Sequence, residues 1–179
     1  GYIESSNSAS INNIQIQSEG GTSVVFTIPT PASIPLQSVV IGQNAMKDTV
    51  DSGIQNVVIG RNSQQYSSGS LGNVSIGFST LQYISSSINN VAIGQLAGYE
   101  NGKYLSGSNN TFLGYNASYG NNTDIENSTA LGANITLTDS NTVILGNGAS
   151  VGIGTTSPSQ KLEVVGDIAI TDFPSVSAS

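Results

Sequence analysis

A short segment that ends in an aliphatic residue followed by glycine recurs along most of the chain. Successive glycines of these pairs are 18, 17, 17, 20, 18 and 14 residues apart. The pairs are Ile41 and Gly42, Ile59 and Gly60, Ile76 and Gly77, Ile93 and Gly94, Leu113 and Gly114, Leu131 and Gly132, and Leu145 and Gly146. Residues 151–154 are a shorter echo. Such a fixed period indicates a stack of similar structural units.

Each segment has a constant face and a variable face. The position before the glycine is always Ile or Leu, and the position three before it is always Val or Thr. Because side chains alternate along a strand, these two positions share one face. The middle position varies among Val, Ser, Ala, Phe and Ile. We therefore expect the constant aliphatic column to point inward and the variable position to point outward.

The length of the unit suits one coil that contains two short strands. Glycine permits a turn with φ above zero, which a Cβ would penalise. The Asn that precedes most of these strands is expected to bond the preceding turn and to pair with its counterparts in neighbouring coils. Only 6% of residues are aromatic and none is Trp, which favours a narrow core repeated along an axis. The prediction is an all-β parallel solenoid of about seven short coils.

The two ends of the chain do not repeat. Residues 1–36 contain two alternating strand-like stretches around a Gly-Gly turn, typical of a β-hairpin or shaft segment. Pro29, Pro31 and Pro35 then mark a boundary, and residues 37–150 are the expected solenoid. Residues 151–179 are predicted as a C-terminal segment with a turn at 155–159, a strand, a turn at Gly166 and a second strand. We expect both ends to cap the open coils.

Two resemblances cover most of the chain. The unit Asn-x-x-Ile-Gly-x-x-Ala in residues 37–150 resembles the head repeats of trimeric autotransporter adhesins. This resemblance implies a left-handed parallel β-roll in an intertwined or closely packed homotrimer. Residues 151–168 look like a stretch common in phage and virus tail-fibre proteins, often just before an intramolecular chaperone of the endosialidase type. The repeats here are longer and less regular than the usual adhesin unit.

These resemblances imply an extracellular, structural and receptor-binding role. The expectation is a segment of a trimeric viral, phage-type tail fibre of the virion, which attaches to a host cell surface through glycans or a protein receptor. One alternative is the head of a bacterial trimeric autotransporter-type adhesin on the bacterial surface. A second alternative is a glycan-degrading fibre enzyme.

Composition removes several kinds of chemistry. The chain has no His and no Cys, which excludes Ser-His-Asp and Cys-His catalysis and most zinc sites. It has 4 Lys and Arg against 11 Asp and Glu, a balance that disfavours nucleic acid and anionic membranes. No apolar run reaches the roughly 18 residues of a membrane span. We expect no catalytic residues, no cofactor, no metal and no membrane insertion.

Two pairs of carboxylates are candidate acid–base groups. These pairs are Asp48 with Asp51, and Asp124 with Glu126, all between repeats. Glycosidases use such pairs, and Asp124 with Glu126 could also hold calcium, although no spacing signature supports this. A solvated loop face is the simpler interpretation of both pairs. The sequence at 152–157 misses a dinucleotide fingerprint and is interpreted as a turn.

Tyrosine is the contact residue enriched between the repeats. The six tyrosines expected in loops are Tyr66, Tyr83, Tyr99, Tyr104, Tyr115 and Tyr119. A tyrosine ring can stack on a sugar while its hydroxyl finds a polar partner. The longest insertion spans residues 98–104, so we predict a ligand site at Tyr99, Glu100, Lys103 and Tyr104. The competing hypothesis is that these tyrosines fill contacts between chains.

Overall fold

The computed structural model describes residues 38–48, 54–121 and 123–169. The predicted hairpin in residues 1–36 lies outside the described residues, as does the end of the tail from residue 170. The described part consists of short strands and turns and contains no helix. The strands are β1 (Val39–Ile41), β2 (Val57–Ile59), β3 (Tyr66–Ser68), β4 (Val74–Ile76), β5 (Tyr83–Ser85), β6 (Val91–Ile93), β7 (Thr111–Leu113), β8 (Ser118–Tyr119), β9 (Thr129–Leu131), β10 (Thr136–Leu137), β11 (Val143–Leu145), β12 (Val151–Ile153) and β13 (Leu162–Val164).

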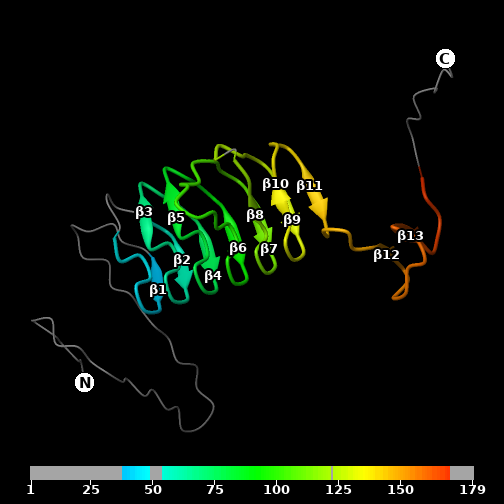
Figure 1. The fold of residues 1–179 in the computed structure, drawn as a ribbon, viewed down its shortest axis with the longest axis horizontal. Helices are drawn as coiled ribbons and strands as arrows, with labels where there is room; N and C mark the ends of the chain where they lie inside the picture. The colour runs from blue at the N-terminus through cyan, green and yellow to red at the C-terminus, as the bar shows by residue number, and fades with distance from the viewer. Residues whose placement is uncertain (1–37, 49–53, 122, 170–179) are drawn as a thin grey trace, which may run out of the picture.

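One parallel sheet runs the length of the repeat. Its strand order is β1-β2-β4-β6-β7-β9-β11, with one strand from each repeated segment (Figure 1). The register keeps equivalent positions side by side, so Val57 pairs with Val74 and Ile59 pairs with Ile76. This confirms an all-β parallel solenoid. The stack amounts to about six turns instead of the predicted seven, because no strand after β11 rejoins the sheet.

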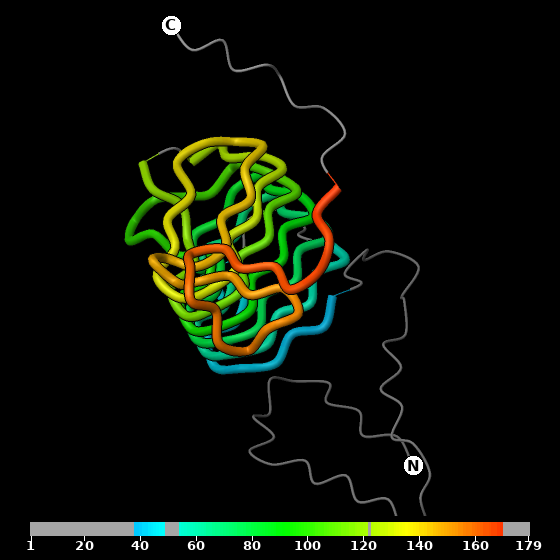
Figure 2. Tube along the Cα trace, turned by 90° about the vertical axis from the view of Figure 1, so that its right-hand side faces the viewer, coloured from blue at the N-terminus to red at the C-terminus, as the bar shows by residue number. Residues whose placement is uncertain are grey.

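Shorter ladders form the other sides of the coil. β3 pairs with β5 and β8 pairs with β10, both in parallel. Isolated bridges join Ile54, Leu71 and Ile88 from one coil to the next. Seen along the stack, successive turns lie over one another as a flattened ring (Figure 2). Each coil therefore contacts mainly the coils before and after it, as expected for a solenoid.

The two faces of the repeated strand point in the opposite directions to those predicted. The middle residue is buried, as in Ser75, Ala92 and Phe112, which are each 0% exposed. The constant aliphatic position points outward: Ile93 is 36% exposed and Leu131 is 44% exposed. The predicted inward aliphatic column is therefore wrong. The alternation of the side chains was predicted correctly. In a coil this narrow, however, the space inside each turn decides which side chain is buried, and that space varies along the stack.

The interior changes character along the axis. In the early coils it is polar: Ser63 Oγ lies 3.0 Å from Ser75 Oγ and 2.7 Å from Thr80 Oγ1, and Gln64 Nε2 donates to Ser75 Oγ at 2.9 Å. In the later coils it is apolar. That core comprises Leu81, Ile84, Ala92, Ala97, Leu105, Phe112, Ala117, Tyr119, Ile125, Ala130, Ile135 and Leu137. A polar interior is tolerated because nearly all of its groups bond one another; Gln64 Oε1 is the one buried polar side-chain atom of the described residues without a partner.

A continuous asparagine ladder joins the coils. The backbone N–H groups of Asn73, Asn90 and Asn110 donate to the Oδ1 atom of the Asn one coil earlier, at 2.8, 2.8 and 2.9 Å. All of these side chains are fully buried. Each Nδ2 also donates to a carbonyl of the next coil, as Asn73 does to Ser87 at 3.0 Å. The predicted pairing of Asn side chains between coils is confirmed. The predicted bond of each Asn to the preceding turn of its own coil is wrong, because these side chains bond the following coil.

Glycine after each strand is required for two reasons. The φ angle of Gly60 is 132°, in the region that L side chains rarely adopt. An added Cβ at Gly60 would also lie 2.1 Å from the carbonyl oxygen of Gly77 in the next coil. The same close approach recurs at Gly42, Gly77, Gly94 and Gly114. The glycine column therefore fixes the turn and also lets adjacent coils come into contact.

The C-terminal segment forms its own small sheet. β12 pairs with β13 in parallel, with Val151 opposite Leu162. Glu163 Oε2 accepts bonds from the backbone N–H and the hydroxyl of Ser159, at 2.5 and 2.8 Å, and these bonds lower the pKa of the Glu163 carboxyl. The turn predicted at 155–159 and the strand after it are confirmed, but residues 167–169 form no second strand. Among the described residues no helix is long and apolar enough to cross a membrane.

We predict that Gly60→Ala destabilises the stack far more than Gly102→Ala does. Both glycines have positive φ, but a Cβ at Gly102 would meet nothing within 4 Å. Urea unfolding should show a loss of roughly 2–4 kcal/mol for Gly60→Ala. Gly102→Ala should cost only the backbone strain of about 1–2 kcal/mol. Equal losses for the two variants would show that the coils do not approach as closely as described.

Candidate functional site

The predicted ligand loop is a folded turn between β6 and β7. The coil from Gly94 to Gly114 is 20 residues long, against 17 for each of the two coils before it. Within this turn the backbone N–H of Lys103 donates to the carbonyl of Glu100 at 3.1 Å. The extra residues therefore bulge from the coil while the strands on either side keep their register.

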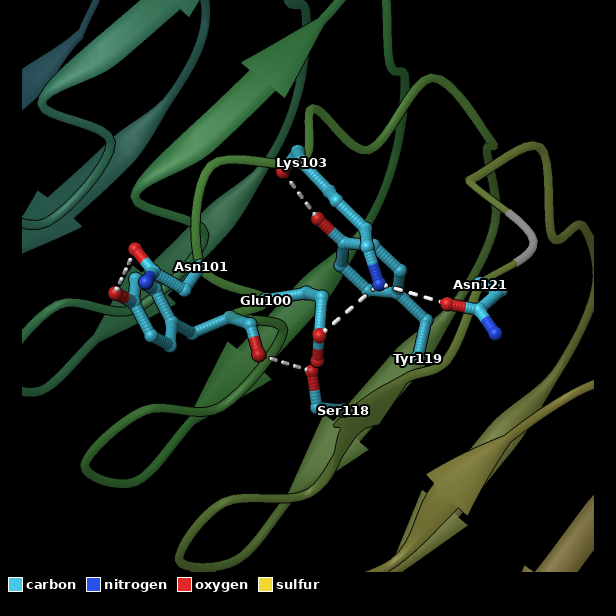
Figure 3. A network of polar contacts seen from close by, with 7 residues as sticks. Glu100, Asn101, Lys103, Ser118, Tyr119 and Asn121 are labelled. Carbon is cyan, nitrogen blue, oxygen red and sulfur yellow. Dashed lines mark hydrogen bonds and ion pairs between the residues drawn. The ribbon is translucent and has the colours of Figure 1, made fainter.

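The charged residues of the loop are brought together. Lys103 Nζ lies 3.1 Å from Glu100 Oε1 and donates to Asn121 Oδ1 of the next coil at 2.9 Å (Figure 3). This is the one ion pair in the described part of the chain. Both side chains are partly exposed, so the pair adds little to the free energy of folding. Its main effect is to hold the ammonium group and the carboxylate at the rim of the loop with no net charge.

Two residues of β8 fix the backbone of the loop from beneath. The Tyr119 hydroxyl donates to the carbonyl of Lys103 at 2.7 Å, and Ser118 Oγ donates to the carbonyl of Tyr99 (Figure 3). Tyr119 is fully buried and belongs to the core, so its prediction as a loop contact residue was wrong. Burial raises the pKa of the Tyr119 hydroxyl, with a smaller contribution from the charge of Glu100.

Four tyrosines form what we term the tyrosine cluster: Tyr66, Tyr83, Tyr99 and Tyr104. The rings of Tyr66 and Tyr83 stack at 4.9 Å with planes 12° apart. Tyr104 meets Tyr83 edge-on at 5.5 Å and 76°, and Tyr99 lies 6.0 Å from Tyr83 at 38°. Burial, and then the neighbouring rings, raise the pKa of Tyr83. The cluster therefore unites two predicted site residues with two tyrosines from earlier coils.

The spacing of the tyrosines in the sequence could have predicted this cluster. Tyr66 and Tyr83 are the first residues of β3 and β5, not loop residues, and they pair directly in the register. They are 17 residues apart, which is the length of one coil. The bridge between Ile84 and Leu105 places Tyr104 next in the same column. Tyr115 is 50% exposed in the turn after Gly114 and makes no ring contact with any described residue.

Of the two carboxylate pairs, only Asp124 with Glu126 lies fully within the described residues. Asp51 lies outside the described residues, so the first pair has no geometry to report. Asp124 accepts a bond from Ser106 Oγ, and the Glu126 backbone N–H donates to Ser140 Oγ at 3.1 Å. Among residues 38–48, 54–121 and 123–169 no three His, Cys, Asp or Glu side chains come together as a metal site.

The outward side of the seven-stranded sheet is a second candidate surface. We term it the aliphatic face; it consists of the outward residues of the seven strands. These residues are Val39, Ile41, Val57, Ile59, Val74, Ile76, Val91, Ile93, Thr111, Leu113, Thr129, Leu131, Val143 and Leu145. None is charged, and at ~4.8 Å per strand the face extends about 29 Å. All of these residues are exposed or half-buried, and an uncharged, largely apolar surface of this extent is a candidate interaction site.

Comparison with protein-family models, curated proteins and solved structures finds no match for this chain.

We predict a pH-dependent contribution from the buried Tyr119 hydroxyl. Tyr119→Phe should lower the free energy of unfolding by about 1 kcal/mol at pH 8, because the Lys103 carbonyl loses its donor. Above the ordinary pKa of 10.0, the unfolded chain ionises this tyrosine while the folded chain keeps it protonated. The contribution of the hydroxyl is therefore present below pH 10 and declines as the pH rises beyond it.

Urea unfolding at pH 8 and pH 11 checks this prediction. The difference between the wild type and Tyr119→Phe should shrink at the higher pH. A parallel loss of stability in both proteins would show that Tyr119 is not buried as described.

Proposed function

We propose that the chain is a structural and receptor-binding segment of a trimeric, phage-type viral tail fibre that attaches to a host cell surface through glycans. In this proposal three left-handed coils pack about one axis through their aliphatic faces. The chain is extracellular on the virion and carries out no catalysis. The three-chain assembly, the handedness and the carrier are drawn from the resemblance of the repeats and of residues 151–168.

The outward position of the constant aliphatic columns is the observation that carries this proposal. A strand face that met only water would be free to take polar residues, as antiparallel sheets commonly do. Here the outward column stays Ile or Leu in all seven segments, whereas the inward position varies. The constraint on the outward column therefore comes from something packed against it.

A second copy of the chain is the partner that matches this face best. The columns repeat at the spacing of the coils, and an identical chain presents the same columns at the same spacing. Uncharged aliphatic surfaces associate by removing apolar area from water, with about 25 cal/mol gained per Å². Symmetric association of identical chains is the usual route to such interfaces.

A bacterial trimeric adhesin head would use the same local packing and would differ in its carrier. The segment at 151–168, which folds as β12 and β13 rather than as a further coil, favours the viral carrier. The genes that flank the coding sequence would distinguish the two, since virion structural genes cluster together. For the glycan-degrading alternative, the described residues contain no pair of carboxylates placed together as an acid–base site.

We predict that the wild-type protein has the mass of three chains in native mass spectrometry and that Ile93→Asp releases single chains. A carboxylate in the packed aliphatic face would be desolvated without a partner, at several kcal/mol per copy. Ile88→Asp is the matched control. Ile88 is 38% exposed, close to the 36% of Ile93, but lies on the bridge ladder outside the seven-stranded sheet.

The control should keep the three-chain mass. Circular dichroism should show that Ile93→Asp retains its β content, since its outward side chain does not support the interior of the coil. A wild-type mass of one chain, or a three-chain mass for Ile93→Asp, would contradict the proposed assembly.

A further inference from the structure

The tyrosine cluster differs from the aliphatic face in extent. Tyr66, Tyr83 and Tyr104 form one column across three coils, and at the next coil Lys103 reaches Asn121. An interface between copies of a solenoid would repeat along every coil, as the outward Ile and Leu column does. The cluster is confined to a few coils on a different sheet, which is the pattern expected of a local ligand site.

The ring geometry of the cluster creates a corner. Tyr66 and Tyr83 are nearly parallel and cover one another's faces. The ring of Tyr104, in the longer coil between Gly94 and Gly114, lies at 76° to that of Tyr83, and Tyr104 is 45% exposed. Tyr104 therefore does not continue the parallel stack, and part of its ring is open to solvent.

Polar residues lie between Tyr99 and Tyr104 in the sequence. The Tyr99 hydroxyl donates to Asn101 Oδ1 at 3.2 Å, and Glu100, Lys103 and Asn121 form the adjoining bonded group (Figure 3). These side chains are partly or largely exposed and supply both donors and acceptors. Because Glu100 neutralises Lys103, the site selects neither sign of charge.

An aromatic face beside mixed neutral donors and acceptors matches one class of ligand. A hexopyranose has a face of C–H groups that stacks on an aromatic ring, and a rim of hydroxyls that both donate and accept hydrogen bonds. An aromatic side chain with a polar handle suits such an amphipathic partner. The overall charge of −7 further favours an uncharged sugar over an acidic one.

We propose that the tyrosine cluster, with Glu100, Lys103 and Asn121 at its rim, binds neutral hexopyranose oligosaccharides. The exposed ring of Tyr104 stacks on the C–H face of one sugar residue. The amide and charged side chains of the rim bond its hydroxyls. This inference rests on the proposed function for the glycan as host receptor, but it does not require three chains.

Saturation-transfer-difference NMR on the full chain tests this site with maltohexaose, cellohexaose and laminarihexaose as separate probes. We expect saturation transfer to the ring C–H protons of at least one probe. Tyr104→Ala should weaken the affinity for that probe about tenfold, the scale of one lost ring contact. Tyr104→Phe keeps the ring and should bind like the wild type. Tyr115→Ala removes a similarly exposed ring outside the cluster and should also leave binding unchanged.

The proposal would be overturned if no saturation transfer reached any of the three probes, or if Tyr104→Ala bound the sugar as well as the wild type does. It would also be overturned if Tyr104→Ala no longer had the same native mass as the wild type. The last result would assign Tyr104 to contacts between chains. The test of the sugar site is independent of the test of the proposed assembly. The sugar titration measures the contribution of Tyr104 to binding, whereas the native mass of Ile93→Asp measures the contribution of the aliphatic face to assembly.

Discussion

The buried asparagine ladder is the interaction on which the stack depends. Each Asn uses both ends of its amide, because Oδ1 accepts the backbone N–H of the next Asn while Nδ2 donates to a carbonyl of the next coil. Truncating Asn73 would leave the buried N–H of Asn90 unpaired, at about 1–3 kcal/mol, while the Ser87 carbonyl keeps the N–H of Leu71 as a donor. Ser38 accepts at one end of the ladder and Ser128 continues it at the other, so hydroxyls serve where the series of Asn stops.

The ladder and the glycine column together help to fix the spacing and the register of the coils without using the middle residues of the strands. This explains why the interior can change from Ser75 to Phe112 at the same position while the sheet continues unbroken. It also explains why the constant aliphatic residues are found outside. In the proposed assembly their constancy is due to packing against a second copy of the chain.

The repeat alone predicts the parallel solenoid, because the glycines and Asn residues that build it are visible at fixed spacing. The direction of each face could not be predicted by the rule that aliphatic residues point inward, since this coil can bury Ser75 among hydroxyl partners. The loop at 98–104 was predicted from its length, but the ion pair between Glu100 and Lys103 was not predicted. The stacking of Tyr66 on Tyr83 was missed because the tyrosines were interpreted as loop residues and were not aligned on the 17-residue coil. Tyr119 was misassigned because a two-residue strand leaves almost no pattern in the sequence.

Amide hydrogen exchange followed by NMR tests the ladder most directly. The backbone N–H groups of Asn73, Asn90 and Asn110 lie just before their strands, where an N–H without a side-chain acceptor would exchange quickly. The account predicts that these amides are among the slowest to exchange, and that Asn73→Ala selectively accelerates exchange at Asn90, whose acceptor is Asn73 Oδ1. Exchange of all three amides as fast as that of the exposed Asn147 would contradict the central role of the ladder.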